Sequence, residues 1–347
     1  MVDMRETPHR NLLPAMLVSA LLLVTSPVSA QQANTRVLEA GDSRLEVAVI
    51  GVDDPTRVAM LQQWLQDVAD APLTVADRFP LRGARVEVRP TDRDDGSPVP
   101  WGQTSRDGDV RVLLYVRDDA TSQELHDDWT AVHELSHLFH PYLGTRGRWL
   151  AEGLASYYQN VLRARIGALD EEEAWRRLDG GFRRGGAART GERLDSIGRG
   201  RGSTMRIYWA GAAYWLDVDL ALRRDNHTSL DAVLAQYGRC CLQGTAQVQP
   251  QDFVQALDGI LAARNGKGAG KATSHEAVFM PLYLHHAAQT TFPSLAANYA
   301  ELGIQRDGDG LQFSHADAAS RLRHAIMHPR KPLVSVTVAP AAGSTVD

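Results

Sequence analysis

Cysteine is nearly absent from this chain. Among its 347 residues there are only two cysteines, and they are neighbours, Cys240 and Cys241. Adjacent cysteines rarely bridge one another, because the resulting geometry is strained. The sequence therefore excludes a disulfide-rich scaffold and predicts a fold held together by its hydrophobic core. A bond between these two cysteines, or from one of them to another chain, is left open as the alternative.

Long apolar runs are also missing beyond the N-terminus. The apolar run Ala15–Val24 is too short to span a membrane stably. Arg5 and Arg10 precede it, and the small residues of Val28-Ser-Ala30 follow it. This pattern is typical of a bacterial secretory signal peptide that is cleaved near Ala30. We expect a periplasmic or secreted protein with no stable membrane span after cleavage; an uncleaved anchor is the alternative.

Positive charge is not in excess either. The formal net charge is −5 and the isoelectric point is about 6.2, which argues against a nucleic-acid-binding protein. The chain that remains after the signal, residues 31–347, is long enough for a large core. That core can belong to one domain or to two closely packed lobes.

The most informative motif is His-Glu-Leu-Ser-His, from His133 to His137. Residues four apart lie on one face of a helix, so His133 and His137 can direct their imidazoles at one ion. Glu134 lies one residue round the helix, near the ion without binding it, where a base that activates water must be. Glu152, in the next expected helix, adds a third ligand. Two histidines and a glutamate leave one zinc position open, so the sequence predicts one Zn²⁺ per chain in a hydrolytic site.

The surroundings of the motif favour a zinc site over an ordinary helix with surface histidines. Thr121 and Glu124 form a capping box at the start of the expected helix, and Pro141 follows its end. Another pair, His324 and His328, is also four residues apart, but an alanine follows the first histidine, so no base is placed there.

Two further histidines share the face of the motif helix. His126 lies two turns before His133, and His140 lies a turn after His137. Either could support a zinc ligand from behind. We expect both to be rim or surface residues instead.

The hydrophobic pattern predicts strands first and helices later. Strands are expected over 36–51, 85–89 and 110–116, a helix over 56–78 and a loop over 90–108. The motif helix is expected over 122–139 and the Glu152 helix over 149–166. The other expected helices are 170–179, 207–224, 228–236, 250–263, 274–289, 293–301 and 315–327.

This order predicts an α+β fold with the metal-binding helices where two lobes join. After the signal peptide at 1–30, we expect a sheet-and-helix lobe at 31–165, a helical lobe at 166–328 and a flexible tail at 329–347. A cleft between lobes is a usual place for a site. If the strand at 110–116 is the sheet edge beside that cleft, it could bind an extended peptide through main-chain hydrogen bonds.

Four segments, taken in order, resemble the glycyl aminopeptidase family of gluzincin metallopeptidases. They are the motif at 133–137, Trp149-Leu-Ala-Glu-Gly-Leu-Ala-Ser-Tyr-Tyr158, the stretch from Ile207 to Arg223, and Ser229-Leu-Asp-Ala-Val233. The resemblance implies a thermolysin-like zincin, in which a small sheet with helices is followed by a helical lobe. It also implies that His133, His137 and Glu152 bind zinc and that Glu134 is the catalytic base.

By the same resemblance, Tyr208 stabilises the oxyanion. The chemistry agrees, because a tetrahedral intermediate needs a donor opposite the zinc; the alternative is an aromatic core residue packed with Trp215. The chain departs from the family in three ways. Only 14 residues separate His137 from Glu152, Ala210 stands where a lysine is expected, and no PDZ module is recognisable.

The sequence thus predicts an exported zinc-dependent peptidase that acts on peptide substrates, with an aminopeptidase favoured. One alternative is an endopeptidase with the same site. Another is a non-catalytic peptide-binding protein on a peptidase fold, against which the intact Glu134 argues. An aminopeptidase needs an acidic group for the α-ammonium group of its substrate, and the sequence does not identify one. Substrate preference and oligomeric state do not follow from it either.

Overall fold

The computed structural model describes residues 34–188, 191–198, 202–264, 277–308, 310–328 and 336–339. The expected signal peptide lies outside these residues, so its prediction stands as it was. Within the described part of the chain, no helix is both long and apolar enough to cross a membrane.

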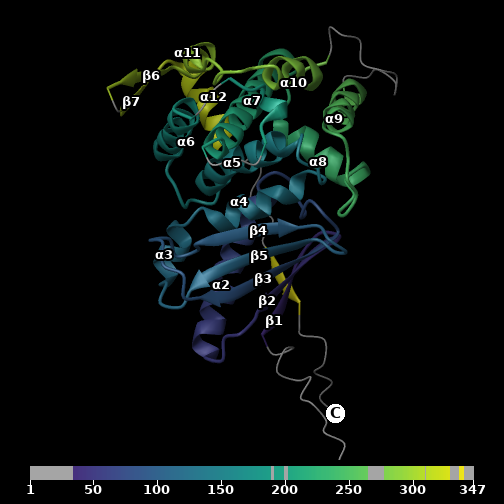
Figure 1. Cartoon of the computed structure of the whole chain (residues 1–347), viewed down its shortest axis with the longest axis vertical. Helices are drawn as coiled ribbons and strands as arrows, with labels where there is room; N and C mark the ends of the chain where they lie inside the picture. The colour runs from purple at the N-terminus through teal and green to yellow at the C-terminus, as the bar shows by residue number, and fades with distance from the viewer. Residues whose placement is uncertain are drawn as a thin grey trace, which may run out of the picture. The chain divides into compact units, whose positions relative to one another are not determined.

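A six-stranded mixed sheet forms one layer of the fold (Figure 1). Its strand order is β4-β5-β3-β2-β1-β8. Strands β2, β3 and β5 run parallel, whereas β4, β1 and β8 are each antiparallel to the strand beside them. The strand bounds are β1 Thr35–Ala40, β2 Ser43–Val49, β3 Gly83–Thr91, β4 Trp101–Ser105, β5 Arg111–Arg117 and β8 Thr337–Ala339.

One face of this sheet is buried under two helices. Along β5, Val112, Leu114 and Val116 are buried while their neighbours are half-exposed, as the period of two in a strand requires. Helix α2 (Pro55–Leu73) packs against β1 and β2, α4 (Thr130–Ser136) packs against β4 and β5, and the two helices contact each other. The helix that carries the histidine motif therefore rests directly on the sheet.

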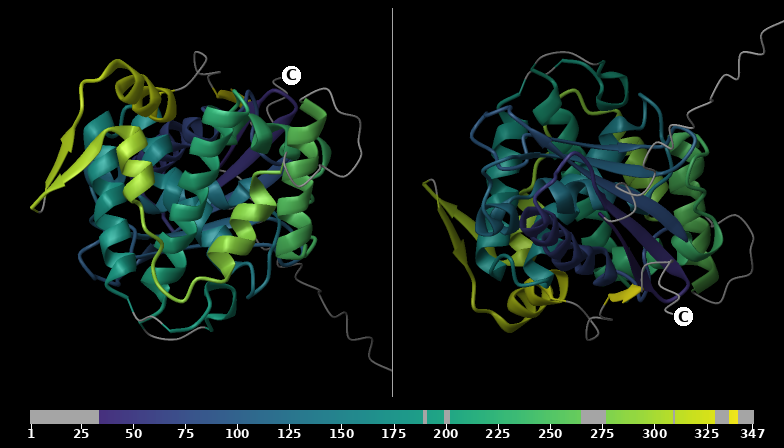
Figure 2. Two further views of the ribbon diagram at one scale, coloured as in Figure 1. Left: turned by 90° about the horizontal axis from the view of Figure 1, so that it is seen from above. Right: turned by 90° about the horizontal axis from the view of Figure 1, so that it is seen from below.

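The remaining helices form the second layer. In Figure 2, they cover the sheet in the view from above, whereas the sheet and α2 lie in front in the view from below. Their bounds are α5 Arg148–Arg165, α6 Glu171–Gly186, α7 Thr204–Asp225, α8 Leu230–Cys240, α9 Pro250–Arg264, α10 Phe279–Ala287, α11 Ala296–Leu302 and α12 Asp317–Met327. These agree with most of the expected helices, but α6 and α8 continue beyond the expected ends at 179 and 236. The helix expected at 274–289 begins at Phe279, and its residues 274–276 lie outside the described part of the chain. The last turns of α6 are marked by glycines, which made its end hard to place.

The edge of the sheet differs from the expectation. The expected loop 90–108 contains the last residues of β3 and all of β4, and β4 is the edge strand. The strand expected at 110–116, β5, lies between β3 and β4 and has no free edge. The short run Trp-Gly-Gln-Thr-Ser of β4 has little apolar alternation, so its pairing with β5 rather than its own pattern makes it a strand.

Three other strands were not expected. Strand β8 comes from the expected flexible tail, where Val37, Leu38 and Glu39 of β1 pair with it. Strands β6 (Ile304–Asp307) and β7 (Gly310–Phe313) form a separate antiparallel pair. All of these strands are short, and short strands acquire their stability from partners rather than from a periodic pattern of their own.

The expected motif helix at 122–139 is broken into three pieces. They are α3 (Ser122–Asp127), α4 and the single 3₁₀ turn His137–Phe139. The capping box of Thr121 and Glu124 is confirmed at the start of α3. Asp128 has an extended backbone, and its carboxylate accepts a hydrogen bond from the amide of Thr130 at 2.7 Å. This local side-chain hydrogen bond offers the backbone an alternative to a continuous helix and explains the break.

Cys240 and Cys241 are joined by a disulfide at the end of α8, with their Cα atoms 3.7 Å apart. This differs from the expectation that adjacent cysteines would not bridge each other. The bond closes a ring within one turn of chain, so it connects no distant parts of the fold. The expectation that the core holds the fold together is therefore compatible with it.

Helices α5 and α7 cross at a pair of glycines. A Cβ on Gly211 of α7 would lie 1.9 Å from the carbonyl oxygen of Trp149 and 2.8 Å from the Cα of Gly153 on α5. A Cβ on Gly153 would lie 2.3 Å from the carbonyl carbon of Gly211. The two backbones thus touch at positions where no other residue fits.

We predict that Gly211→Ala destabilises the protein by about 1–3 kcal/mol, the usual cost of overpacking. The clash is with backbone atoms of α5, so only a separation of the two helices can relieve it. The free energy of unfolding in urea measures the effect.

Gly259→Ala on α9 is the matched control, because a Cβ there meets nothing within 4 Å. We expect this helical glycine to gain about 0.4–1 kcal/mol on substitution, through the unfolded chain. Equal losses at Gly211 and Gly259 would contradict the importance of the crossing.

Candidate active site

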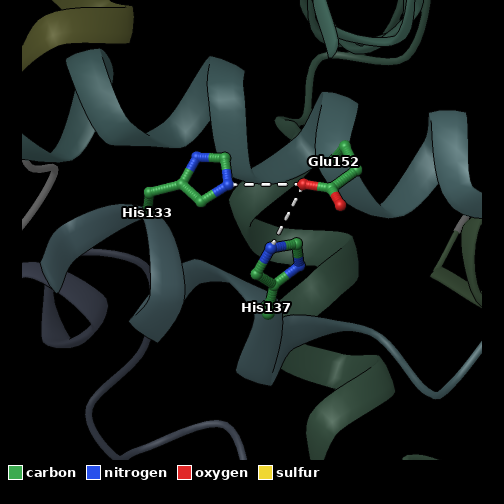
Figure 3. Close-up of side chains that lie close together, drawn as sticks. All are labelled: His133, His137 and Glu152. Carbon is green, nitrogen blue, oxygen red and sulfur yellow. Dashed lines mark ion pairs between the residues drawn. The ribbon is translucent and has the colours of Figure 1, made fainter. Parts of the chain in front are cut away.

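The two motif histidines keep a common face although their helix is short. Helix α4 ends at Ser136, and His137 caps it with helical dihedral angles of φ −63° and ψ −16°. The four-residue spacing therefore places both imidazoles on one side of the turn. Figure 3 shows His133 and His137 directed at Glu152, which comes from α5. The structure thus brings together the three residues predicted to bind metal.

The spacing of the three side chains suits a zinc ion. His133 Nε2 lies 3.5 Å and His137 Nε2 lies 3.6 Å from Glu152 Oε2. Zinc bonds of about 2.0–2.1 Å in a tetrahedral arrangement separate ligand atoms by about 3.3 Å. Two imidazoles and a carboxylate are also ligands that zinc accepts, so the residues present fit the ion.

A chain of hydrogen bonds fixes His137 with its Nε2 lone pair toward the site. His140 Nδ1 lies 2.7 Å from the carbonyl oxygen of Pro141, which can only accept, so Nδ1 of His140 carries the proton. Burial, with Arg106 nearby, lowers the pKa of His140 to about 3 and keeps the ring neutral. His140 Nε2 therefore accepts from His137 Nδ1 at 2.9 Å. The expectation of a rim position for His140 was wrong, because this ring is buried behind the ligand.

His133 is fixed in the same way by Gln159. Its Nδ1 lies 2.8 Å from Gln159 Oε1, an acceptor, so Nε2 is left free to bind a metal. Gln159 lies two turns after Glu152 on α5, on the same face of that helix. The spacing of seven residues was the only signal in the sequence that could have pointed to it. His126, the other histidine expected on the face of the motif helix, pairs with Asp67 and remains partly exposed, as expected.

Glu134 faces the site from α4 and is held by the edge strand. Its Oε2 accepts a hydrogen bond from Thr104 Oγ1 at 2.9 Å. Burial raises the pKa of Glu134 to about 7. A carboxyl group with such a pKa can take up and release a proton near neutral pH. A Cβ on Gly102 would lie 2.8 Å from Glu134 Cγ, so β4 passes as closely as glycine allows.

Glu152 is ionised in these surroundings. Burial alone would raise its pKa, but the neighbouring imidazoles of His133 and His137 lower the pKa to about 2. Burial lowers the pKa of His137 well below its ordinary value, so this imidazole is neutral. An ionised carboxylate beside a neutral imidazole is the protonation state that a metal requires of its ligands.

Tyr208 completes the group from α7. Its ring stacks on His133 with centroids 5.7 Å apart and planes 7° apart, and its hydroxyl forms a hydrogen bond with Glu152. Burial raises the pKa of the Tyr208 phenol well above its ordinary value, so the hydroxyl keeps its proton and can donate it in a hydrogen bond. The ring is half-buried rather than part of the core next to Trp215, which is fully buried.

A cavity of about 540 Å³ opens beside these side chains. Glu134, His137, Glu152 and Tyr208 all line it, and residues 102–105 of β4 form one wall. The ligands His137 and Glu152, the buried carboxyl group of Glu134 and the phenol of Tyr208 therefore face one space that is open to a substrate.

No protein-family model matches the chain, and no curated protein matches it. Solved structures do match. An aminopeptidase N family protein from Idiomarina loihiensis aligns with 78% of this chain at a TM-score of 0.53 and 15% sequence identity. The alignment covers 49% of that protein, so this chain spans about half of its length.

Two further solved structures are less similar. An M1 zinc metallopeptidase from Deinococcus radiodurans has a TM-score of 0.43 and 14% identity, and the match covers 75% of this chain and 51% of the other. Native leukotriene A4 hydrolase from Saccharomyces cerevisiae has a TM-score of 0.43 and 12% identity, with 76% and 42% covered. The similarity to the Idiomarina protein shows that this chain has the mixed α/β fold found in part of an aminopeptidase N family protein.

Proposed function

We propose that this protein is a zinc-dependent peptidase. The observation that carries the proposal is the convergence of His133, His137 and Glu152 on one point, with Glu134 and Tyr208 lining the same cavity as His137 and Glu152. The fold shared with an aminopeptidase N family protein supports it. We also propose the finer assignments that the sequence suggested, namely a gluzincin with a thermolysin-like arrangement, related to the glycyl aminopeptidase family.

In the proposed mechanism, His133, His137 and Glu152 would hold Zn²⁺, which when bound would act as a Lewis acid that polarises a peptide carbonyl. Glu134 takes a proton from the attacking water and returns it to the leaving amine, which its pKa near 7 allows. The hydroxyl of Tyr208 donates a hydrogen bond to the oxyanion. Glu134, His137, Glu152 and Tyr208 line the cavity, and His133 belongs to the same helix as Glu134.

The edge strand β4 is the proposed guide for the substrate. Its outer edge has no strand partner among the described residues, and residues 102–105 line the cavity. An extended peptide can add to such an edge by main-chain hydrogen bonds. This replaces β5 as the candidate, because β5 is paired on both sides.

The aminopeptidase proposal needs an acceptor for an α-ammonium group. Among the described residues that line the cavity, the carboxylates are Asp107, Glu134 and Glu152. Glu134 and Glu152 already have roles in the mechanism, so Asp107, just after β4, is the candidate acceptor. Because Asp107 is exposed, its ion pair with an ammonium group would be weak. An endopeptidase, which needs no such acceptor, is therefore the second candidate function.

Export belongs to the proposal as well. The basic, apolar and small-residue pattern of the first thirty residues motivates a signal peptide and a periplasmic or secreted enzyme. N-terminal sequencing of the mature protein recovered from cell fractions tests it, and a start at Met1 would contradict cleavage.

We predict that Glu134→Gln keeps its zinc and loses about 10²–10⁴-fold in kcat, since general acid–base catalysis contributes that much. Zinc content is measured alongside the hydrolysis rate. Glu172→Gln on the surface of α6 is the control, because its exposed carboxylate pairs with Arg176 away from the cavity-lining residues. Full activity of Glu134→Gln would rule out its role as base.

We predict that Tyr208→Phe lowers kcat by about 10²–10³-fold, as the loss of one oxyanion donor does. The ring that stacks on His133 remains, so zinc content and KM should change little. A steady-state comparison of kcat and KM on one peptide separates the two effects. A rise in KM with unchanged kcat would assign Tyr208 to substrate binding.

Peptides with free and N-acetylated termini distinguish the two modes of cleavage. For an aminopeptidase, we predict stepwise N-terminal trimming of free peptides only, and a rise in KM in Asp107→Asn because the ammonium group loses its partner. Mass spectrometry of the products, with Glu134→Gln as the inactive reference, gives the cleavage sites. Internal cuts in N-acetylated peptides would establish the endopeptidase instead.

A further inference from the structure

A second cavity of about 540 Å³ lies where α5, α6 and α7 meet beside Trp129. Three of the residues that line it contact the proposed zinc ligand His133. The Trp129 ring meets the His133 ring edge-on with centroids 5.3 Å apart, Gln159 holds its Nδ1, and Tyr208 stacks on it. Tyr208 lines the first cavity as well. The proposed oxyanion donor therefore belongs to the walls of both cavities, and the proposed mechanism uses only the first.

The walls of the second cavity carry more positive than negative charge. Four arginines line it, against one carboxylate, that of Glu173. Two of the arginines are paired along α6, Arg176 with Glu172 at 2.6 Å and Arg177 with Glu173 at 2.8 Å. The four arginines are Arg163, Arg176, Arg177 and Arg184.

Arg163 and Arg184 contact neutral groups instead. Arg163 is buried on α5 and donates to the carbonyl oxygen of Asp127 at 2.7 Å, whereas its Nε and Nη1 have no hydrogen-bond partner among the described residues. Burial, with Arg177 nearby, lowers the pKa of Arg163 to about 10, so this group is still charged at neutral pH. The guanidinium carbon of Arg184 lies over the ring of Trp209, 5.3 Å from its centroid. A buried charge without a hydrogen-bonded counter-ion is costly, and an anion in the cavity would lower that cost.

A solvated basic surface is the simpler explanation of these arginines. It accounts for Arg176 and Arg177, whose side chains are 43% exposed and paired with carboxylates. It does not account for Arg163, because a buried guanidinium gains little from solvent. The cavity beside Arg163 is where a negative group can approach it.

The second cavity also has apolar surface and room for an organic group. Trp129 and Met205 line it and are 42% and 38% exposed. Gly180 of α6 leaves space, since a Cβ there would meet only Nη1 of Arg184, at 3.5 Å. An inorganic anion would leave the apolar surface in water, whereas an amino-acid residue places aliphatic carbon next to its carboxylate. The lining therefore favours a carboxylate that belongs to a peptide.

We propose that the second cavity binds a carboxylate of the substrate on the carboxyl-terminal side of the scissile bond. The inference rests on the proposed peptidase function and adds a substrate class, short peptides with a carboxylate at their C-terminus or on an acidic side chain. With the scissile carbonyl at Tyr208, the ammonium end lies in the first cavity, where Asp107 is the candidate acceptor. The rest of a short peptide then has the second cavity, which Tyr208 also lines, for its carboxyl-terminal part.

Four peptides test the proposal and distinguish the two sources of the carboxylate. They are trialanine, its C-terminal amide, Ala-Ala-Glu amide and Ala-Ala-Gln amide. For a C-terminal carboxylate, we expect trialanine amide to have a KM about 10-fold or more above that of trialanine, because charge-assisted hydrogen bonds are lost. The same preference for the Glu over the Gln peptide would assign the side chain. Equal KM values for all four peptides overturn the proposal.

Variants of the cavity show whether the preference arises there. Arg184→Gln should lower the ratio of the KM values of the amide and the free acid by about twofold to fivefold, as the loss of an exposed ion pair does. Gly180→Leu fills the cavity without a backbone clash and should raise the KM of the free acid. Arg321→Gln is the matched control, because it removes the same charge from an exposed position on α12 outside the cavity. An equal fall of the ratio in Arg184→Gln and Arg321→Gln would indicate a long-range charge effect and overturn the site.

Calorimetric titration of zinc-loaded Glu134→Gln gives a readout that does not depend on turnover. We expect trialanine to bind about 10-fold or more tightly than its amide, and this preference to fall when Arg184→Gln is added. If the unmodified protein hydrolyses neither peptide while this preference remains, the peptidase is overturned and the carboxylate site stands. Hydrolysis of both peptides, with no preference in KM or in binding, leaves the peptidase and overturns the carboxylate site.

Discussion

The backbone contact between Gly153 and Gly211 is the constraint on which the site depends. Gly153 follows Glu152, and Gly211 lies one turn after Tyr208, so the crossing of α5 and α7 brings the carboxylate and the phenol together. Gln159 lies further along the same α5 and reaches His133. Two glycines thus set the distance between the helices that carry Glu152, Gln159 and Tyr208.

The buried polar groups of the site are tolerated because each has a partner. His133, His140 and Glu134 are buried, and an unpaired polar group in such a place costs several kcal/mol, roughly 2–7 on transfer scales. Gln159, Pro141 and Thr104 provide those partners from α5, the chain after α4 and the edge strand. The same hydrogen bonds that lower the cost of burial also choose the tautomers, so stability and metal-binding geometry have one origin.

What the sequence could predict is what depends on nearby residues. The spacing of His133 and His137, the cap at Thr121 and most helices follow from contacts within a few residues. The errors concern partners far apart in the chain. The hydrogen bond from Thr104 to Glu134 joins residues that are 30 apart in the sequence. Strand β8 pairs with β1 although nearly the whole described chain lies between them in the sequence. Strand β4 is a strand only because β5 lies beside it, and no pattern within residues 101–105 could show that.

The surroundings of two histidine–glutamate clusters differ. One consists of His133, His137 and Glu152, and the other of Glu171, His324 and His328. Both have two imidazoles four residues apart and a carboxylate from another helix, with nearly equal separations. The first is buried, faces a cavity and has Glu134 beside it, whereas His324 and His328 are exposed and have Ala325 at the corresponding position. The ligand types alone therefore do not make a site catalytic. A base of suitable pKa, a donor opposite the ion and a space for substrate do so, and the chain places these at one cluster only among its described residues.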